Sequence, residues 1–277
     1  MVGVTCSVNE QRWLTLGASI RGPQHVRGDL PNQDALKYTC PNDLPLFFAI
    51  ADGHGSKRSM RSDWGSRCAV ECASEILSGL KNNELFLSEI KNQATTKFPK
   101  TLLKQWRHAV HEHYDNVQPF TLAEREILGD ANPLLAYGTT LLTVVVTETF
   151  IGYWQLGDGD ILAVWRDGRV DRPLSKDARF IANETTSLCS PDAWKEFRVL
   201  IQPLIDDPPD LILLCTDGYS NSFVEEDDFF QAGRDFLALL ENEGMAFVQH
   251  NLENWLAQTA QAGSGDDTTL GLIWREF

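Results

Sequence analysis

A continuous run of apolar residues from Pro45 to Ala51 constrains this chain more than any other feature of its sequence. A strand that buries only one face alternates apolar and polar side chains, whereas this run has no polar position. The run therefore predicts a strand that is covered on both faces. It stops at Asp52-Gly-His-Gly55, which is a tight-turn sequence.

The order of the other predicted elements favours a layered α+β fold. Helices do not alternate one for one with strands, so a doubly wound parallel sheet is disfavoured and antiparallel sheets are expected. No shift in composition marks a linker, so residues 1–277 are expected to form a single domain. The predicted strands are 13–20, 35–39, 45–51, 138–146, 150–156, 161–166, 169–172, 197–203, 210–215 and 270–274. The predicted helices are 62–80, 84–116 with an interruption near Pro99, 223–240 and 244–261. Residues 119–133 are expected to be a polar connection with some helix potential, and 173–197 a loop-rich segment.

Composition and charge exclude several classes of protein. The chain is 43% hydrophobic and 23% charged, which is typical of globular proteins, and its net charge of −15 argues against a nucleic-acid binder. No apolar run approaches 18 residues, and the N-terminus lacks the basic and apolar regions of a signal peptide, so no membrane partner is expected. The six cysteines include no Cys-x-x-Cys pair and are few for a disulfide scaffold. These features predict a cytoplasmic protein.

Aspartates stand at the ends of several apolar strands. Asp52, Asp158 and Asp217 each follow such a strand and precede a glycine, and Asp266 comes just before the last strand. Asp34 stands at the head of another strand. A single Asp-Gly pair is an ordinary turn. Four acids at the ends of very apolar strands instead predict that their carboxylates gather at one rim of the sheets.

Gathered carboxylates repel one another and raise each other's pKa values unless cations accompany them. Mg²⁺ and Mn²⁺ prefer oxygen ligands, so a set of divalent cations would remove this penalty. A glycine after the aspartate would let the backbone carbonyl approach a cation closely. The sequence therefore predicts an all-oxygen site for more than one metal, of the kind that activates water for phosphoryl displacement.

These residues resemble the motifs of the metal-dependent protein phosphatases, the type 2C-like serine/threonine phosphatases, in their bacterial branch. The resemblance runs from about Leu16 to Ile273, and the motifs occur in the family's order. They are Pro31-Asn-Gln-Asp34-Ala35, Asp52-Gly-His-Gly55, Gly138-Thr-Thr140, Leu156-Gly-Asp158, Thr216-Asp-Gly218 and Gly265-Asp-Asp-Thr-Thr269.

The resemblance implies a fold of two stacked antiparallel β-sheets flanked by helices, a four-layer αββα sandwich. It implies hydrolysis of phosphoserine and phosphothreonine by a water that bridges two divalent metals, Mn²⁺ or Mg²⁺, with a third, weaker metal site and no phosphoenzyme. The implied partner is a phosphoprotein that a serine/threonine kinase has modified.

The resemblance also implies which residues hold the metals. By position, Asp52 bridges two metals and the carbonyl of Gly53 binds the first. Asp217 and Asp266 complete the second. Asp158 matches a ligand of the third.

Further residues match groups that act beside the metals. Asp34 matches an acid that orders metal-bound water, and His54 matches the general acid for the leaving alkoxide. The position where many members place a phosphate-holding arginine is Asp29 here, which leaves Arg27 and His25 as the nearby cations.

Members of this family commonly have a second acid four residues after the aspartate that corresponds to Asp217. Here that position is Asn221. The third metal is therefore expected to bind weakly or in a rearranged site.

Two other functions remain open on the same residues. One is a catalytically weak or silent domain that binds phosphoproteins, and the other is a hydrolase of small phosphate esters. The presence of Asp52, Asp217, Asp266 and His54 favours an enzyme over a silent domain. No specificity pocket can be identified from the sequence, so the small-ester alternative is not excluded by it.

Overall fold

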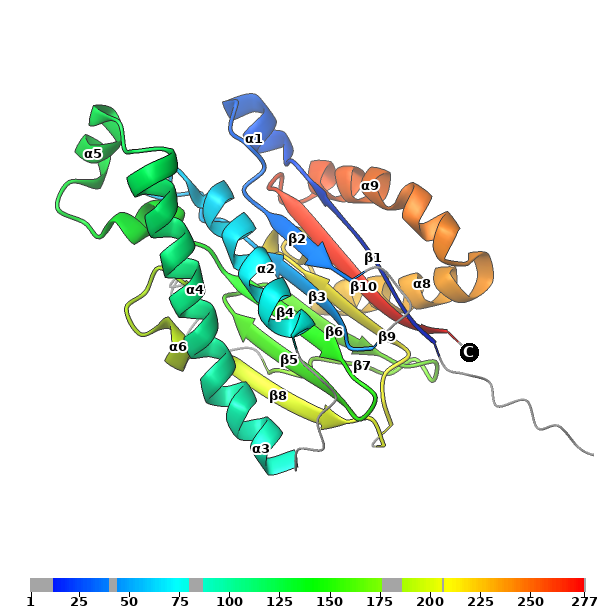
Figure 1. Cartoon of the computed structure of the whole chain (residues 1–277). Coiled ribbons are helices and arrows are strands. Elements are labelled where there is room, and N and C mark those ends of the chain that lie inside the picture. Colours follow the sequence, from blue (N-terminus) through cyan, green and yellow to red (C-terminus); the bar gives the residue numbers. More distant parts are fainter. Residues whose placement is uncertain (1–11, 40–43, 80–86, 176–185, 206, 277) are drawn as a thin grey trace, which may run out of the picture.

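The computed structural model describes residues 12–39, 44–79, 87–175, 186–205 and 207–276, and its strands form two antiparallel sheets of five strands each (Figure 1). The first sheet has the order β1 (Arg12–Ile20), β10 (Thr268–Glu276), β9 (Leu211–Cys215), β6 (Asp160–Val164) and β7 (Val170–Asp171). The second has the order β2 (Ala35–Tyr38), β3 (Leu46–Ala51), β4 (Leu141–Val146), β5 (Phe150–Leu156) and β8 (Arg198–Pro203).

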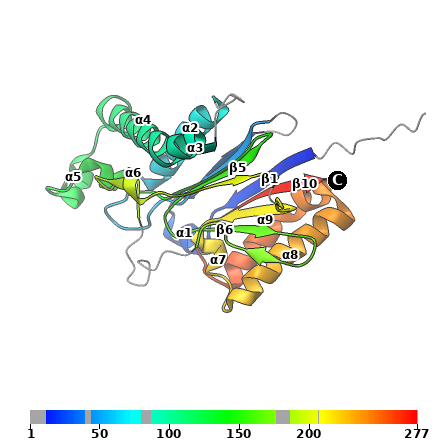
Figure 2. The same ribbon diagram turned by 90° about the horizontal axis from the view of Figure 1, so that it is seen from below.

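Helices cover the outer face of each sheet. Helix α2 (Ser62–Ser78) packs on β2 and β3, and α4 (Phe98–Glu112) packs beside it. Helices α8 (Glu226–Glu243) and α9 (Met245–Ala262) pack on the other sheet. Figure 2 shows the two sheets between these helix layers. The expected α+β class and the four-layer αββα sandwich are confirmed.

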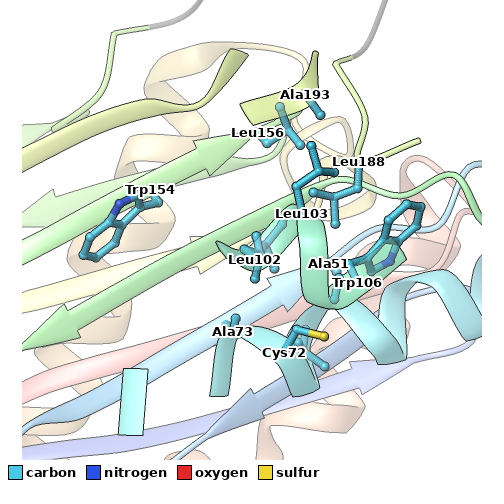
Figure 3. Packing of buried hydrophobic residues seen from close by; sticks show 14 of the residues in the cluster. Ala51, Cys72, Ala73, Leu102, Leu103, Trp106, Trp154, Leu156, Leu188 and Ala193 are labelled. Carbon is cyan, nitrogen blue, oxygen red and sulfur yellow. The ribbon is translucent and has the colours of Figure 1, made fainter. Parts of the chain in front are cut away.

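The position of β3 between two hydrophobic cores explains why its sequence is apolar throughout. Phe47, Ala49 and Ala51 belong to the core under α2 and α4, whereas Phe48 and Ile50 belong to the core between the sheets. Both faces of the strand are therefore buried, as the uninterrupted apolar run predicted. Figure 3 shows part of the helix-side core, whose labelled residues are Ala51, Cys72, Ala73, Leu102, Leu103, Trp106, Trp154, Leu156, Leu188 and Ala193.

The two sheets approach closely at a pair of glycines. Gly17 of β1 lies opposite Gly271 of β10, and the ring of Phe48 from the other sheet lies against both. A Cβ atom at Gly17 would lie 2.5 Å from this ring, and one at Gly271 would lie 2.3 Å from it. The missing side chains thus make room for the aromatic ring that joins the two sheets.

Several short elements were not predicted from the sequence. They are α1 (Pro23–Gly28), α6 (Ala193–Glu196) and α7 (Asp217–Ser220). Each is too short to show an apolar periodicity, which is the main sequence signal for a helix.

The long helical stretch before β4 is more irregular than its sequence suggested. Helix α3 (Leu87–Asn92) continues through a π-helical turn, Gln93–Lys97, into α4. The expected interruption takes the form of this turn, and Pro99, which has no N–H to donate, is the second residue of α4 directly after it. A second π-helical turn (His113–Val117), α5 (Leu122–Leu128) and a 3₁₀ turn (Pro133–Tyr137) lead to β4.

The other predicted elements are confirmed, with shifts of a few residues at their ends. The strand expected from residue 138 begins at Leu141, and the helix expected from residue 223 begins at Glu226. Parts of the expected helices and of the expected loop-rich segment, at 80, 84–86 and 176–185, lie outside the described residues.

Among the described cysteines, Cys68, Cys72, Cys189 and Cys215 are all free thiols. Cys72 of α2 belongs to the core under this helix, and Cys68, one turn earlier on the same helix, packs against the same core. Cys6 and Cys40 lie outside the described residues. None of the helices in the described ranges has the length and apolar character that crossing a membrane requires.

Candidate metal centre

The topology brings the strand-end aspartates to one edge of the two sheets. Strands β3 and β5 are both antiparallel to β4, so they run in the same direction and end at the same edge. In the other sheet β9 is antiparallel to β10, so β9 ends where β10 begins. A cavity of about 180 Å³ lies at this edge. It is lined by His25, Gln33, Asp52, Gly53, His54, Gly55, Thr140, Asp158, Asp217, Asp266 and Asp267.

All five predicted metal-ligating residues therefore lie at one cavity, together with His54 and His25. Asp34 and Arg27 are not among the described residues that line it. Sequence reasoning missed Gln33, Thr140 and Asp267 as residues of the cavity wall. Asp267 could have been identified from the sequence, because it directly follows Asp266 in the Gly265-Asp-Asp motif.

Backbone contacts to the Gly138-Thr139-Thr140 segment hold Asp52 in place. The carbonyl oxygen of Asp52 accepts hydrogen bonds from the N–H of Thr140 and from Thr139 Oγ1, both at 2.9 Å. The N–H of Asp52 donates to Thr140 Oγ1 at 3.0 Å. These bonds use only the main chain of Asp52, so its carboxylate stays available at the cavity.

The carboxyl groups of Asp52 and Asp217 share a hydrogen bond, and this pair sits in a field of negative charge. Burial raises the pKa of Asp52 well above its ordinary value, and the charges of Asp34, Asp217 and Asp158 raise it further. Burial also raises the pKa of Asp217, and the charges of Asp158 and Asp266 add to this effect. Without cations, the site therefore retains protons that its carboxylates would normally lose.

Asp34 lies behind the cavity wall, where two threonine hydroxyls hold it. Its Oδ2 accepts from Thr216 Oγ1 at 2.8 Å and from Thr269 Oγ1 at 2.7 Å. Burial raises the pKa of Asp34 well above its ordinary value, although these two hydrogen bonds oppose the shift. Thr216 directly precedes Asp217, so Asp34 braces the turn that carries this aspartate.

His25 and Arg27 of α1 lie in different surroundings. The side chain of His25 is only 12% exposed, and its Nδ1 lies 2.6 Å from Asp267 Oδ2. Arg27 is exposed on the same helix. Of the two cations considered for holding a phosphate, the structure therefore places only His25 at the cavity.

His54 is half-buried beside the cavity, and a glycine makes room for its ring. The backbone N–H of His54 donates to the carbonyl of Gly138 at 3.0 Å. A Cβ atom at Gly138 would lie 2.6 Å from Cδ2 of the His54 ring. Burial lowers the pKa of His54, while the charge of Asp158 opposes this shift.

Asn221 stands where a further acid was expected, and it bonds to a neighbouring ligand candidate. Its Nδ2 donates to Asp217 Oδ2 at 3.0 Å. Asn221 itself is not among the described residues that line the cavity, whereas Asp158 is.

The glycines after the strand-end aspartates also let neighbouring turns pack closely. A Cβ atom at Gly53 would lie 2.6 Å from the carbonyl oxygen of Gln33, and one at Gly159 would lie 2.6 Å from that of Cys215. At Gly218 it would lie 2.0 Å from the carbonyl oxygen of Asp267. The glycines thus let one turn pack against the backbone of another, which brings the aspartates together.

Gly218→Ala is expected to destabilise the protein by about 1–3 kcal/mol, which is typical of overpacking a rigid contact. The clash is with a backbone oxygen, so the turn that carries Asp217 must move away from Asp267. Chemical denaturation measures the change. Gly79→Ala is the matched control, because its nearest neighbours would lie 3.4 and 3.6 Å away. Equal stability of the two variants would show that the turn adjusts without cost.

Residues 21–257 match the protein phosphatase 2C family. The chain belongs to the protein phosphatase 2C family. The matched region contains Asp52, Asp158 and Asp217 but ends before Asp266. The place of Asp266 in the site therefore rests on its position at the cavity, as well as on the motif around it.

Solved structures of protein phosphatases share the fold. The catalytic domain of PstP, solved with two manganese ions, has a TM-score of 0.60 at 18% identity and covers 96% of this chain and 100% of its own. The same values hold for PstP/Ppp of Mycobacterium tuberculosis. Stp1 of Staphylococcus aureus has a TM-score of 0.63 at 17% identity, and 95% of each chain is covered. No curated protein matches the sequence. At these identities the likeness establishes the fold alone.

Proposed function

We propose that this member of the protein phosphatase 2C family is a metal-dependent serine/threonine protein phosphatase that acts as one domain over residues 1–277. The observation that carries the proposal is the convergence of Asp52, Asp158, Asp217 and Asp266 on one cavity. Its substrate would be a phosphoprotein that a serine/threonine kinase has modified, and its compartment the cytoplasm.

The residues of the cavity fit divalent cations. Burial and mutual repulsion raise the pKa values of Asp52 and Asp217, so the metal-free arrangement is electrostatically unfavourable. Bound cations would relieve this repulsion, and the carboxylate oxygens are the ligands that Mn²⁺ and Mg²⁺ prefer. When bound, a pair of such cations supplies a water of lowered pKa and stabilises charge on a transferring phosphoryl group.

Each residue of the site has a proposed role. Asp52 would hold two cations, with the Gly53 carbonyl on the first. Asp217 and Asp266 would hold the second. Asp158 would hold a third, weaker one.

The residues beside these ligands would orient water and protonate the leaving group. His54 would donate a proton to the leaving alkoxide oxygen, which needs one because an alkoxide is a poor leaving group. Asp34 would orient water through the turn that it braces. Arg27 is not among the described residues that line the cavity, so it would not contact the substrate. His25 lines the cavity and would belong to the site.

Release of phosphate from a phosphothreonine peptide tests the proposal. Activity is expected with Mn²⁺ or Mg²⁺ and is expected to disappear with excess chelator, because the carboxylates alone bind no phosphate. Full activity after dialysis against chelator would contradict the metal mechanism. Binding of the peptide without turnover would indicate a silent phosphoprotein-binding domain. Turnover of small phosphate esters alone would indicate a small-molecule hydrolase.

A further inference from the structure

The imidazole of His25 lies between the two consecutive acids at the start of β10. Its Nδ1 is 2.6 Å from Asp267 Oδ2, and its Nε2 is 3.5 Å from Asp266 Oδ1. Donor atoms from all three side chains lie within 4.8 Å of one another. The three residues also line the cavity that contains Asp52 and Asp217.

Asp267 holds a fixed orientation, so it also fixes the ring of His25. Its side chain is 3% exposed, its Oδ1 accepts from the N–H of Gly22 at 2.7 Å, and its Oδ2 accepts from the N–H of Gln33 at 2.6 Å. These contacts tie the start of β10 to the segments before α1 and before β2.

The two ring nitrogens of His25 have different neighbours. Nδ1 faces two acceptors, Asp267 Oδ2 and the carbonyl oxygen of Pro31 at 3.2 Å, so it is the nitrogen that donates to the protein. Nε2 points to the other side of the ring, where Asp266 lies.

Histidines that bind a metal through one ring nitrogen almost always donate the other N–H to a carboxylate, a carbonyl or a water, and the contacts of Nδ1 match this pattern. We propose that His25 Nε2 is a direct ligand of a divalent cation that Asp266 also binds, and that Asp267 is the positioning residue for this histidine. The inference rests on the proposed metal centre and changes its donor set from all oxygen to mixed nitrogen and oxygen.

Gln33 provides an independent sign that the cavity is built around a ligand. The residue is 6% exposed, and its Oε1 has no hydrogen-bond partner among the described residues. Gln33 lines the same cavity as His25 and Asp266. An unpartnered buried oxygen is costly, and a water bound to a cation in this cavity would give it a donor.

A nitrogen ligand changes which cation the site prefers. Oxygen ligands suit both Mn²⁺ and Mg²⁺, but Mn²⁺, as a transition metal, accepts an imidazole nitrogen more readily than the hard Mg²⁺ ion does. The proposal therefore selects Mn²⁺ over Mg²⁺, a choice that the sequence left open. His25→Ala is expected to weaken Mn²⁺ binding by at least about tenfold and to weaken Mg²⁺ binding less.

Pulsed electron paramagnetic resonance of the Mn²⁺-loaded protein tests the assignment without measuring activity. A bound imidazole couples its ¹⁴N nucleus to the Mn²⁺ electron spin, and labelling histidine with ¹⁵N changes this signal. The histidine coupling is expected in the wild-type protein and in His54→Ala, and it is expected to be absent from His25→Ala. Calorimetric titrations of both variants with Mn²⁺ and Mg²⁺ provide the second readout.

Absence of histidine coupling in the wild-type protein would overturn the inference before any variant is made, so it stays testable if His25→Ala fails to fold. Coupling that persists in His25→Ala would also overturn it. Inhibition by inorganic phosphate that weakens in His25→Ala, with no nitrogen coupling in the wild type, would assign the ring to the phosphate instead. Hydrolysis of a phosphopeptide without nitrogen coupling would refute this inference and leave the proposed function standing.

Discussion

Asp217→Asn is expected to abolish release of phosphate from a phosphothreonine peptide while the fold survives. Asp217 shares a hydrogen bond with Asp52 and faces the charges of Asp158 and Asp266, so it belongs to a common anionic site. Removing this charge should weaken cation binding by more than about 100-fold, beyond the 10–100-fold that follows loss of a group that only orients a ligand. The same loss is expected for Asp52→Asn. Phosphate release at a fixed, modest Mn²⁺ concentration measures both.

The same substitution is expected to stabilise the protein when no metal is bound. Burial, together with the neighbouring carboxylates, raises the pKa of Asp217 above its ordinary value of 3.8. The folded protein therefore binds more protons here than the unfolded chain does, so the free energy of unfolding falls as the pH rises through the raised pKa. The melting temperature of Asp217→Asn in chelator should exceed that of the wild type at pH 8. The difference should shrink as the pH falls toward 4.

Asp130→Asn is the control for both measurements, because Asp130 is exposed and is not among the described residues that line the cavity. It should leave the activity unchanged and should not raise the melting temperature in chelator. Near-normal turnover of Asp217→Asn at modest metal concentration would show that the ligand assignment is wrong. A melting temperature below that of the wild type at pH 8 would show that repulsion does not dominate the metal-free site.

His54→Ala is expected to slow hydrolysis of a phosphothreonine peptide far more than hydrolysis of para-nitrophenyl phosphate. The leaving alkoxide needs a proton, whereas nitrophenolate leaves without one. Loss of a general acid typically costs about 10²–10⁴-fold where proton transfer limits the rate. Burial lowers the pKa of His54 and the charge of Asp158 opposes this shift, so the protonated ring is a stronger acid but is less populated at neutral pH. The ratio of kcat/KM for the two substrates is the measurement.

His250→Ala is the matched control, since His250 is exposed on α9. Equal losses on the two substrates in His54→Ala, together with weaker metal binding, would remove His54 from the acid role. Such a result would mean that the ring only supports the turn beside Asp52. The contact of this ring with Gly138 shows how that support would be made.

Much of the fold and most of the proposed site could be predicted because their signals are local in the sequence. The run from Pro45 to Ala51 required layers on both faces, and both layers are present. Asp52, Asp158 and Asp217 were recognisable because each directly follows an apolar strand. The short helices α1 and α7 were missed because six and four residues are too few to show a periodicity.

The sequence by itself determined the number of strand-end carboxylates and the antiparallel layered class. Only the tertiary structure decided that His25, rather than Arg27, stands at the cavity and that Asp267 fixes its ring. It also showed that the glycines make room for neighbouring backbones. Strand patterns repeat within a few residues, so they are visible along the chain. The His25–Asp267 and Gly218–Asp267 contacts join separate segments of the sequence, and they exist only once the sheets have packed.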